Sequence, residues 1–194
     1  MKIKIPNYLT IGRIIIVPIF VFTFYLPGFY GDVLPFVLFV IASFTDFLDG
    51  LLARMFKEES KLGELLDPIA DKIIVATALI LLVMDETIKS YEVIAAIIIL
   101  TREILISGLR EFLAKGKINL PVSNLSKYKT FLQMLSISLL LTGETGNKIM
   151  NFQDYNAQTI GIILLWLSAF ITLYTAYEYL RKGIDHAISE DNKD

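Results

Sequence analysis

Cysteine is absent from the 194 residues, and histidine occurs only once, at His186. The missing cysteines exclude disulfide bonds and thiolate chemistry, and His186 on the C-terminal tail is not expected to be a metal ligand. Charge is missing from two long stretches, residues 14–31 and 155–177, which carry no charged side chain over 18 and 23 positions. Because about 20 consecutive apolar residues span a hydrocarbon core, these stretches predict membrane-spanning helices.

The rest of the chain extends this pattern. Hydrophobic residues make up 55% of the sequence and the mean hydropathy is +0.60, which exceeds the apolar share usual in soluble domains. Short connections separate the apolar segments, and the two strong segments frame weaker ones. We therefore predict one domain over residues 1–194, an all-α membrane protein with six transmembrane helices. The helices are expected near residues 8–28, 33–55, 63–84, 91–112, 128–143 and 157–180.

The distribution of basic residues predicts the orientation. With the N-terminus placed in the cytoplasm, 15 of the 18 lysines and arginines fall on the inner side, and two, Lys89 and Lys148, fall on the outer side. This positive-inside bias places both termini in the cytoplasm. The first apolar stretch contains Arg13 and has no small-residue cleavage site, so it is expected to stay as a helix. The net charge of −2 indicates no particular partner, and we expect no nucleic acid.

Polar residues interrupt the apolar pattern at "DFLDGLLARMFKEESKLGELLDPIADK", residues 46–72. This stretch ends the second predicted helix and begins the third, on the cytoplasmic side. Two aspartates on each helix recur with helical spacing, so each pair shares one face. The short loop makes the helices antiparallel neighbours, so the two acidic faces can converge. The four aspartates are Asp46, Asp49, Asp67 and Asp71.

Four carboxylates at the edge of a low-dielectric slab repel one another unless cations neutralise them. Oxygen ligands without nearby cysteine or histidine favour Mg²⁺ or Mn²⁺, and four acids are enough for two such ions. Paired ions of this kind serve phosphoryl displacement, and Arg54 could hold a phosphate. The alternative is a solvated acidic patch that pairs with Arg54, Lys57, Lys61 and Lys72.

The pattern Asp46-x2-Asp49-Gly50-x2-Ala53-Arg54-x8-Gly63-x3-Asp67-x3-Asp71 resembles the signature of the CDP-alcohol phosphotransferases without a departure. Three further stretches are similar to the branch of that family that makes phosphatidylglycerophosphate. They are "IPNYLTIGRIIIVPIF" at the start, "TREILISGLRE" in the fourth segment and "SKYKT" before the fifth. Together the motifs cover most of the first 130 residues, and the last 60 match only as apolar helices.

The resemblance implies six transmembrane helices in a homodimer, with a cavity that opens to the cytoplasm and to membrane lipids. It also implies two divalent cations. Asp46 and Asp67 would bridge both ions, Asp49 would complete one site, and Asp71 would complete the other and act as general base. The positions that match the family's cytidine diphosphate contacts are Gly50, Arg54 and Ser60.

The implied reaction is attack by an acceptor hydroxyl on the β-phosphorus of CDP-diacylglycerol, with CMP leaving. The resemblance favours glycerol 3-phosphate as acceptor and a multi-pass protein of the bacterial cell membrane with its active site on the cytoplasmic side. A dianionic acceptor needs fixed positive charge, so we expect its phosphate at four basic residues of segments 4 and 5. These are Arg102, Arg110, Lys127 and Lys129; alternatively, they are ordinary anchors that contact lipid headgroups.

Other functions remain open at this point. The same chemistry could use inositol phosphate, or phosphatidylglycerol as in cardiolipin synthesis. A divalent-cation transporter also places carboxylates in membrane helices, although its acids should extend toward the midplane rather than cluster at one mouth. The tyrosines of the last helix, Tyr174, Tyr177 and Tyr179, are expected to be lipid-facing or interfacial.

Overall fold

The computed structural model describes residues 5–56, 61–115, 124–150 and 156–191. Within these ranges the chain is all helical, with seven helices and no strand. The helices are α1 (Ile5–Phe24), α2 (Phe29–Phe56), α3 (Lys61–Met84), α4 (Glu92–Lys115), α5 (Asn124–Leu141), α6 (Gly143–Ile149) and α7 (Ala157–Asp191). The six predicted segments correspond to the six long helices, and the short α6 was not predicted.

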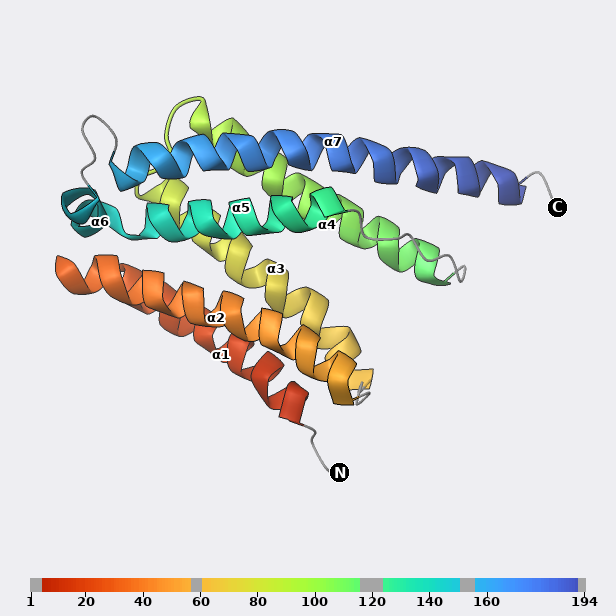
Figure 1. Cartoon of the computed structure of the whole chain (residues 1–194), viewed down its shortest axis with the longest axis horizontal. Helices are drawn as coiled ribbons and strands as arrows, with labels where there is room; N and C mark the ends of the chain where they lie inside the picture. The colour runs from red at the N-terminus through yellow and green to blue at the C-terminus, as the bar shows by residue number, and fades with distance from the viewer. Residues whose placement is uncertain (1–4, 57–60, 116–123, 151–155, 192–194) are drawn as a thin grey trace.

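The helices run back and forth between two ends of an elongated bundle (Figure 1). α7 packs along α4 and α5, and α1 packs along α2 and α3. The first residues of α1, α3 and α5 lie toward the same end as the last residues of α2, α4 and α7, on the right of Figure 1. This end therefore brings together the predicted metal residues of α2 and α3 and the basic residues of α4 and α5. Hereafter it is called the motif end.

Local sequence explains where several helices begin and end. Asn156 precedes α7, and its side-chain oxygen accepts hydrogen bonds from the backbone N–H (2.8 Å) and the hydroxyl (2.9 Å) of Thr159, as an N-cap does. Between α3 and α4 the chain turns through Glu86 and Ser90, which both have positive φ. Gly28 (φ +64) makes the turn before α2, where a side chain would strain the backbone.

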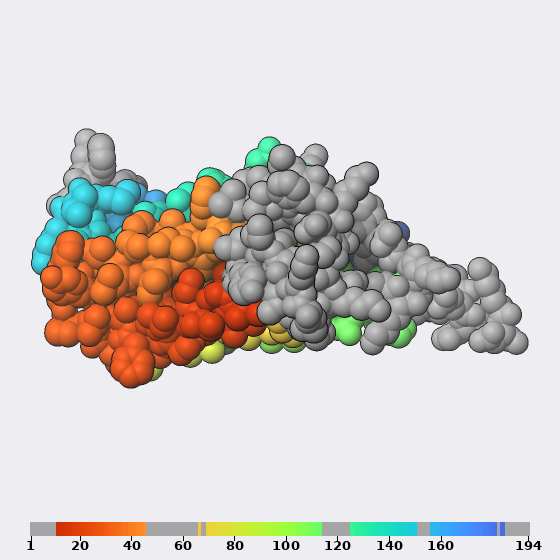
Figure 2. All heavy atoms as spheres, turned by 90° about the horizontal axis from the view of Figure 1, so that it is seen from below, coloured from red at the N-terminus to blue at the C-terminus, as the bar shows by residue number. Residues whose placement is uncertain are grey.

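The core lies between the helices, and much of the outer surface is also apolar. The side chains at the centre of the core include Phe20, Phe39, Leu79, Ile99 and Leu165, all with no exposed surface. Large apolar side chains are exposed on all six long helices: Phe22 on α1, Phe44 on α2, Ile80 on α3, Ile104 on α4, Phe131 on α5 and Phe170 on α7. In the view from below, α1 and α2 lie side by side on the left part of the molecule (Figure 2).

One described helix is long and apolar enough to cross a membrane by itself, over Ala157–Arg181 of α7. Two shorter apolar stretches, Ile11–Phe24 and Phe29–Thr45, belong to α1 and α2. The fold is thus helical throughout its described part and contains a segment suited to a bilayer.

Candidate functional site

The four motif aspartates lie on two neighbouring helices at the motif end. Asp46 and Asp49 belong to the second half of α2, and Asp67 and Asp71 to the first half of α3, so the helical spacing assumed from the sequence is present in the backbone. Of these four side chains the structure describes only that of Asp71, which is half-buried. No group of three or more metal-ligand side chains occurs among the described residues, and the other three aspartate side chains lie outside them.

The structure also leaves most of the expected cytidine diphosphate contacts undescribed. Gly50 and Arg54 are positions of α2, but their side-chain environment is not among the described features, and Ser60 lies outside the described residues. Both α2 positions follow Asp49 on the same helix, toward the motif end. The donor-site prediction therefore stays a prediction.

A largely buried ion network joins α4 to α5 near Asp71. The ammonium of Lys129 donates to Glu103 Oε1, and Arg102 Nη1 donates to the same oxygen at 3.3 Å. Lys129 is only 2% exposed, and the side chains of Arg102 and Glu103 are 10% and 22% exposed. Because a buried charge without a partner is costly, Glu103 fixes the two cations in this position.

The second arginine of α4 contacts α7. Arg110 Nη2 donates to the phenolic oxygen of Tyr179 at 2.8 Å, and its guanidinium carbon lies 4.8 Å from the centre of the Tyr179 ring. Tyr179 is 3% exposed, so the expectation of a lipid-facing or interfacial tyrosine is wrong at this position. Arg102 also contacts α7, where its Nη2 lies 3.5 Å from Thr175 Oγ1.

Residues of α3 connect the motif to this network. Asp71 lies close enough to Lys129 to act on it electrostatically, and Lys72 does the same to Glu103. Lys72 also donates to Ser107 Oγ on α4. The aspartate predicted to be the base and one of the cations predicted to hold the acceptor phosphate therefore occupy one neighbourhood.

The resulting cluster, hereafter the α4 basic cluster, consists of Lys72, Arg102, Arg110 and Lys129 with Glu103. Arg110 is near enough to Arg102 for the two cations to repel each other. Within the described contacts of this cluster, four cations accompany the carboxylates of Asp71 and Glu103, and such a local excess suits a phosphate dianion. Lys127 is on α5 but is exposed, and no contact with this cluster is described for it.

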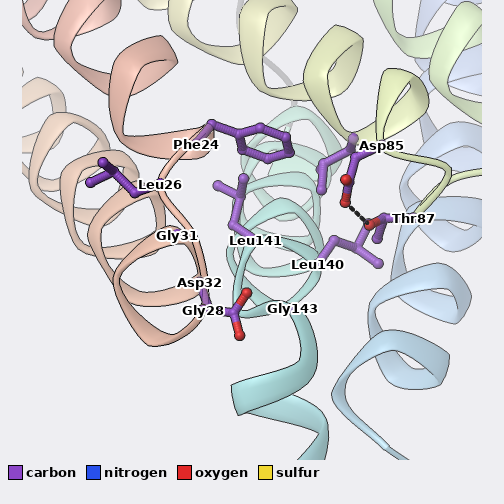
Figure 3. Close-up of a pocket in the computed structure, with 11 residues that line it drawn as sticks. Phe24, Leu26, Gly28, Gly31, Asp32, Asp85, Thr87, Leu140, Leu141 and Gly143 are labelled. Atoms are coloured by element: carbon purple, nitrogen blue, oxygen red, sulfur yellow. Dashed lines mark hydrogen bonds between the residues drawn. The ribbon is translucent and has the colours of Figure 1, made fainter.

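A separate cavity of about 170 Å³ lies at the opposite end of the bundle. It is lined by the α1–α2 turn, the last turn of α3 and the end of α5, and contains none of the predicted site residues (Figure 3). Its polar groups are already paired: Thr87 donates to Asp85 at 3.1 Å, and Asp32 accepts from the backbone N–H of Thr145 at 2.8 Å. We therefore place the candidate site at the motif end.

Comparisons with known proteins agree with the motif. The sequence profile described as CDP-alcohol phosphatidyltransferase matches residues 3–174. The chain belongs to the CDP-alcohol phosphatidyltransferase family. The match continues well past the first 130 residues that carry the recognisable motifs, into α7.

Curated members of this family are similar over nearly the whole chain. A protein of Rickettsia bellii is 44% identical over 183 residues, which cover 93% of this chain and 97% of that protein. A protein of Haemophilus influenzae is 39% identical with 93% and 94% coverage, and one of Cereibacter sphaeroides is 34% identical with 98% and 100% coverage. All three are named CDP-diacylglycerol–glycerol-3-phosphate 3-phosphatidyltransferase. This family membership makes the chain a CDP-diacylglycerol-dependent phosphatidyltransferase.

Sequence reasoning missed two residues of the site, Glu103 and Tyr179. Glu103 is the only acid between residues 93 and 110, and a lone acid in an apolar segment was a usable signal. Nothing comparable marked Tyr179, since an aromatic side chain near a helix end is common in membrane proteins.

Proposed function

We propose that this protein transfers a phosphatidyl group from CDP-diacylglycerol to glycerol 3-phosphate, forming phosphatidylglycerophosphate and CMP in phospholipid synthesis. The observation that carries this proposal is the similarity, at up to 44% identity over 93% of the chain, to proteins named for that reaction. The α4 basic cluster supports it independently, because the acceptor is a phosphate dianion that needs several fixed cations.

The proposal includes a six-span topology with both termini and the active site on the cytoplasmic side. Support comes from the basic residues, of which 15 of 18 would fall on the cytoplasmic side in this topology, and from the alternating directions of the six long helices (Figure 1). The exposed apolar side chains on those helices suit contact with acyl chains. A homodimer in the bacterial cell membrane is part of the same proposal and rests on the resemblance.

The donor set of the motif fits divalent cations. It consists only of carboxylates, with two at i, i+3 on α2 and two at i, i+4 on α3, and the two helices are neighbours at one end of the bundle. Oxygen-only ligands suit Mg²⁺ or Mn²⁺. Asp46, Asp49, Asp67 and Asp71 would hold two such ions, which when bound supply charge stabilisation at the transferred phosphoryl group.

The protein's own groups then divide the remaining work. Arg102, Arg110 and Lys129 bind the phosphate of the acceptor and orient its free hydroxyl, while Gly50 and Arg54 belong to the cytidine diphosphate site. The hydroxyl oxygen forms a bond to the β-phosphorus of the donor, and the bond from that phosphorus to CMP breaks. The proton of the hydroxyl passes to the carboxylate of Asp71. The nearness of Asp71 to Lys129, on which it acts electrostatically, supports this role.

An acceptor panel tests this function. Purified protein receives CDP-diacylglycerol, Mg²⁺ and one acceptor at a time: glycerol 3-phosphate, inositol phosphate, phosphatidylglycerol or water, and CMP release is measured. We expect rapid release with glycerol 3-phosphate and little with the others. Faster release with inositol phosphate or phosphatidylglycerol would assign a different acceptor. No release with any acceptor, together with uptake of divalent cations into proteoliposomes, would favour the transporter.

A further inference from the structure

Tyr179 is the feature of the α4 basic cluster that neither the motif nor the proposed reaction accounts for. It is 3% exposed, and its ring packs with Ile106 of α4 and Ala176 of α7. Close packing of this kind restricts a side chain to one rotamer. A tyrosine held in this way presents its hydroxyl and its ring face at fixed positions.

Arg110 uses both of these groups. Its Nη2 donates to the Tyr179 hydroxyl at 2.8 Å, and its guanidinium carbon is 4.8 Å from the ring centre. Tyr179 therefore holds the planar guanidinium of Arg110 through both a hydrogen bond and a cation–π contact. Arg110 itself is exposed, so without this support its long side chain would sample many rotamers.

The position of this contact on α7 has a second consequence. Thr175 and Tyr179 are one helical turn apart, and they contact Arg102 and Arg110 respectively. α4 also approaches α7 closely at Gly183, where an added Cβ would lie 2.9 Å from a methyl carbon of Leu109. One face of α7 thus contacts both arginines of the proposed acceptor site.

We propose that Tyr179 is a positioning residue for the acceptor phosphate: it holds the guanidinium of Arg110 in the orientation that binds the phosphate of glycerol 3-phosphate. This inference rests on the proposed function. Orienting Arg110 before the acceptor arrives removes an ordering cost from binding, so the contribution of Tyr179 should appear in the acceptor KM. The proposed donor site is at Gly50 and Arg54 of α2, away from Tyr179. The KM for CDP-diacylglycerol should therefore not depend on Tyr179.

The test uses Tyr179→Phe, Tyr179→Leu, Arg110→Ala and the double variant Arg110→Ala/Tyr179→Phe of the full chain. Tyr179→Phe keeps the ring and removes only the hydroxyl, so we expect the KM for glycerol 3-phosphate to rise about threefold. Tyr179→Leu removes both contacts and should raise it about tenfold or more. Donor KM and kcat should stay close to wild type in Tyr179→Phe. Tyr177→Phe, on the same helix but 65% exposed, is the matched control and should change neither KM.

Coupling to Arg110 separates positioning from a general structural role. If Tyr179 acts only through Arg110, adding Tyr179→Phe to Arg110→Ala should not raise the acceptor KM further. Inhibition by inorganic phosphate, competing with the acceptor, should weaken in parallel with the KM. An unchanged acceptor KM in Tyr179→Phe, equal effects on both substrates, or an additive double variant would overturn the proposal. If Arg110→Ala itself leaves the acceptor KM unchanged, the proposed acceptor site fails, and the positioning role fails with it.

Discussion

Lys129 of α5 and Glu103 of α4 form an ion pair that is almost withdrawn from solvent, with exposures of 2% and 22%. The pair connects two helices whose positions in sequence are 26 residues apart. Arg102 shares the same carboxylate, so a single acid holds two of the cations proposed to bind the acceptor phosphate. The helix packing and the proposed acceptor site therefore share this residue.

Glu103→Ala should destabilise the protein by about 3–5 kcal/mol, because it leaves Lys129 buried without its carboxylate. Thermal unfolding in detergent measures this. The matched control is Glu144→Ala, which breaks the exposed pair with Lys148 on α6 (side chains 84% and 76% exposed). An exposed pair contributes less than about 1 kcal/mol. Equal changes in Tm for the two variants would show that the buried pair does not stabilise the fold.

Arg110→Ala should raise the KM for glycerol 3-phosphate at least about tenfold, since one charged contact contributes about 1.5–3 kcal/mol. The KM for CDP-diacylglycerol should change little. Steady-state kinetics with each substrate varied in turn provide the measurement. Arg181→Ala, which removes an exposed arginine of α7, should leave both values unchanged. An equal rise in both KM values for Arg110→Ala would mean that Arg110 is structural.

Asp71→Asn should abolish turnover while CDP-diacylglycerol binding stays largely intact. Asparagine keeps the size of the side chain but cannot accept the proton of the attacking hydroxyl, and three carboxylates remain for cations. CMP release and donor binding are measured on the same preparation. Asp85→Asn, at the exposed opposite end, serves as the control. Turnover near the wild-type rate in Asp71→Asn would remove Asp71 from the mechanism.

Chelation should abolish activity reversibly, with Mg²⁺ or Mn²⁺ restoring it and monovalent salt failing to do so. Asp46→Ala should lose activity at ordinary Mg²⁺ and recover only partly at high Mg²⁺, because the remaining carboxylates bind cations more weakly. Asp85→Ala is again the control. Full activity of the wild-type protein in excess chelator would contradict the metal proposal. The four aspartates would then be interpreted as a solvated acidic patch.

Much of the fold follows from local sequence, and its limits are also physical. Uncharged stretches place the long helices, since a bilayer-length apolar run has few other uses. The same criterion misplaced helix ends: α7 continues past residue 180 to Asp191 because a charged helix can extend beyond an apolar segment. It also missed α6, whose seven residues include Glu144 and Lys148 and lack an apolar period.

In the candidate site, too, some residues could be identified from the sequence, while the contacts between helices could not. The aspartates were identifiable because each pair is spaced along one helix and a short segment joins the two helices. Arg102, Arg110 and Lys129 were identifiable because they are charges in or next to apolar segments. The contacts of Lys129 with Glu103 and of Arg110 with Tyr179 depend on how whole helices rotate against each other. A single sequence carries no signal for that rotation, so Tyr179 was expected to face lipid and is instead buried.

The central claim is that the α4 basic cluster and the motif aspartates join a phosphatidyl group to glycerol 3-phosphate. The most direct measurement supplies purified protein with CDP-diacylglycerol, Mg²⁺ and isotope-labelled glycerol 3-phosphate, and identifies the lipid product by mass. We predict that the label enters phosphatidylglycerophosphate in a one-to-one ratio with released CMP, and that chelator stops both. CMP release without label in the lipid, or a lipid product formed only with another acceptor, would contradict the account.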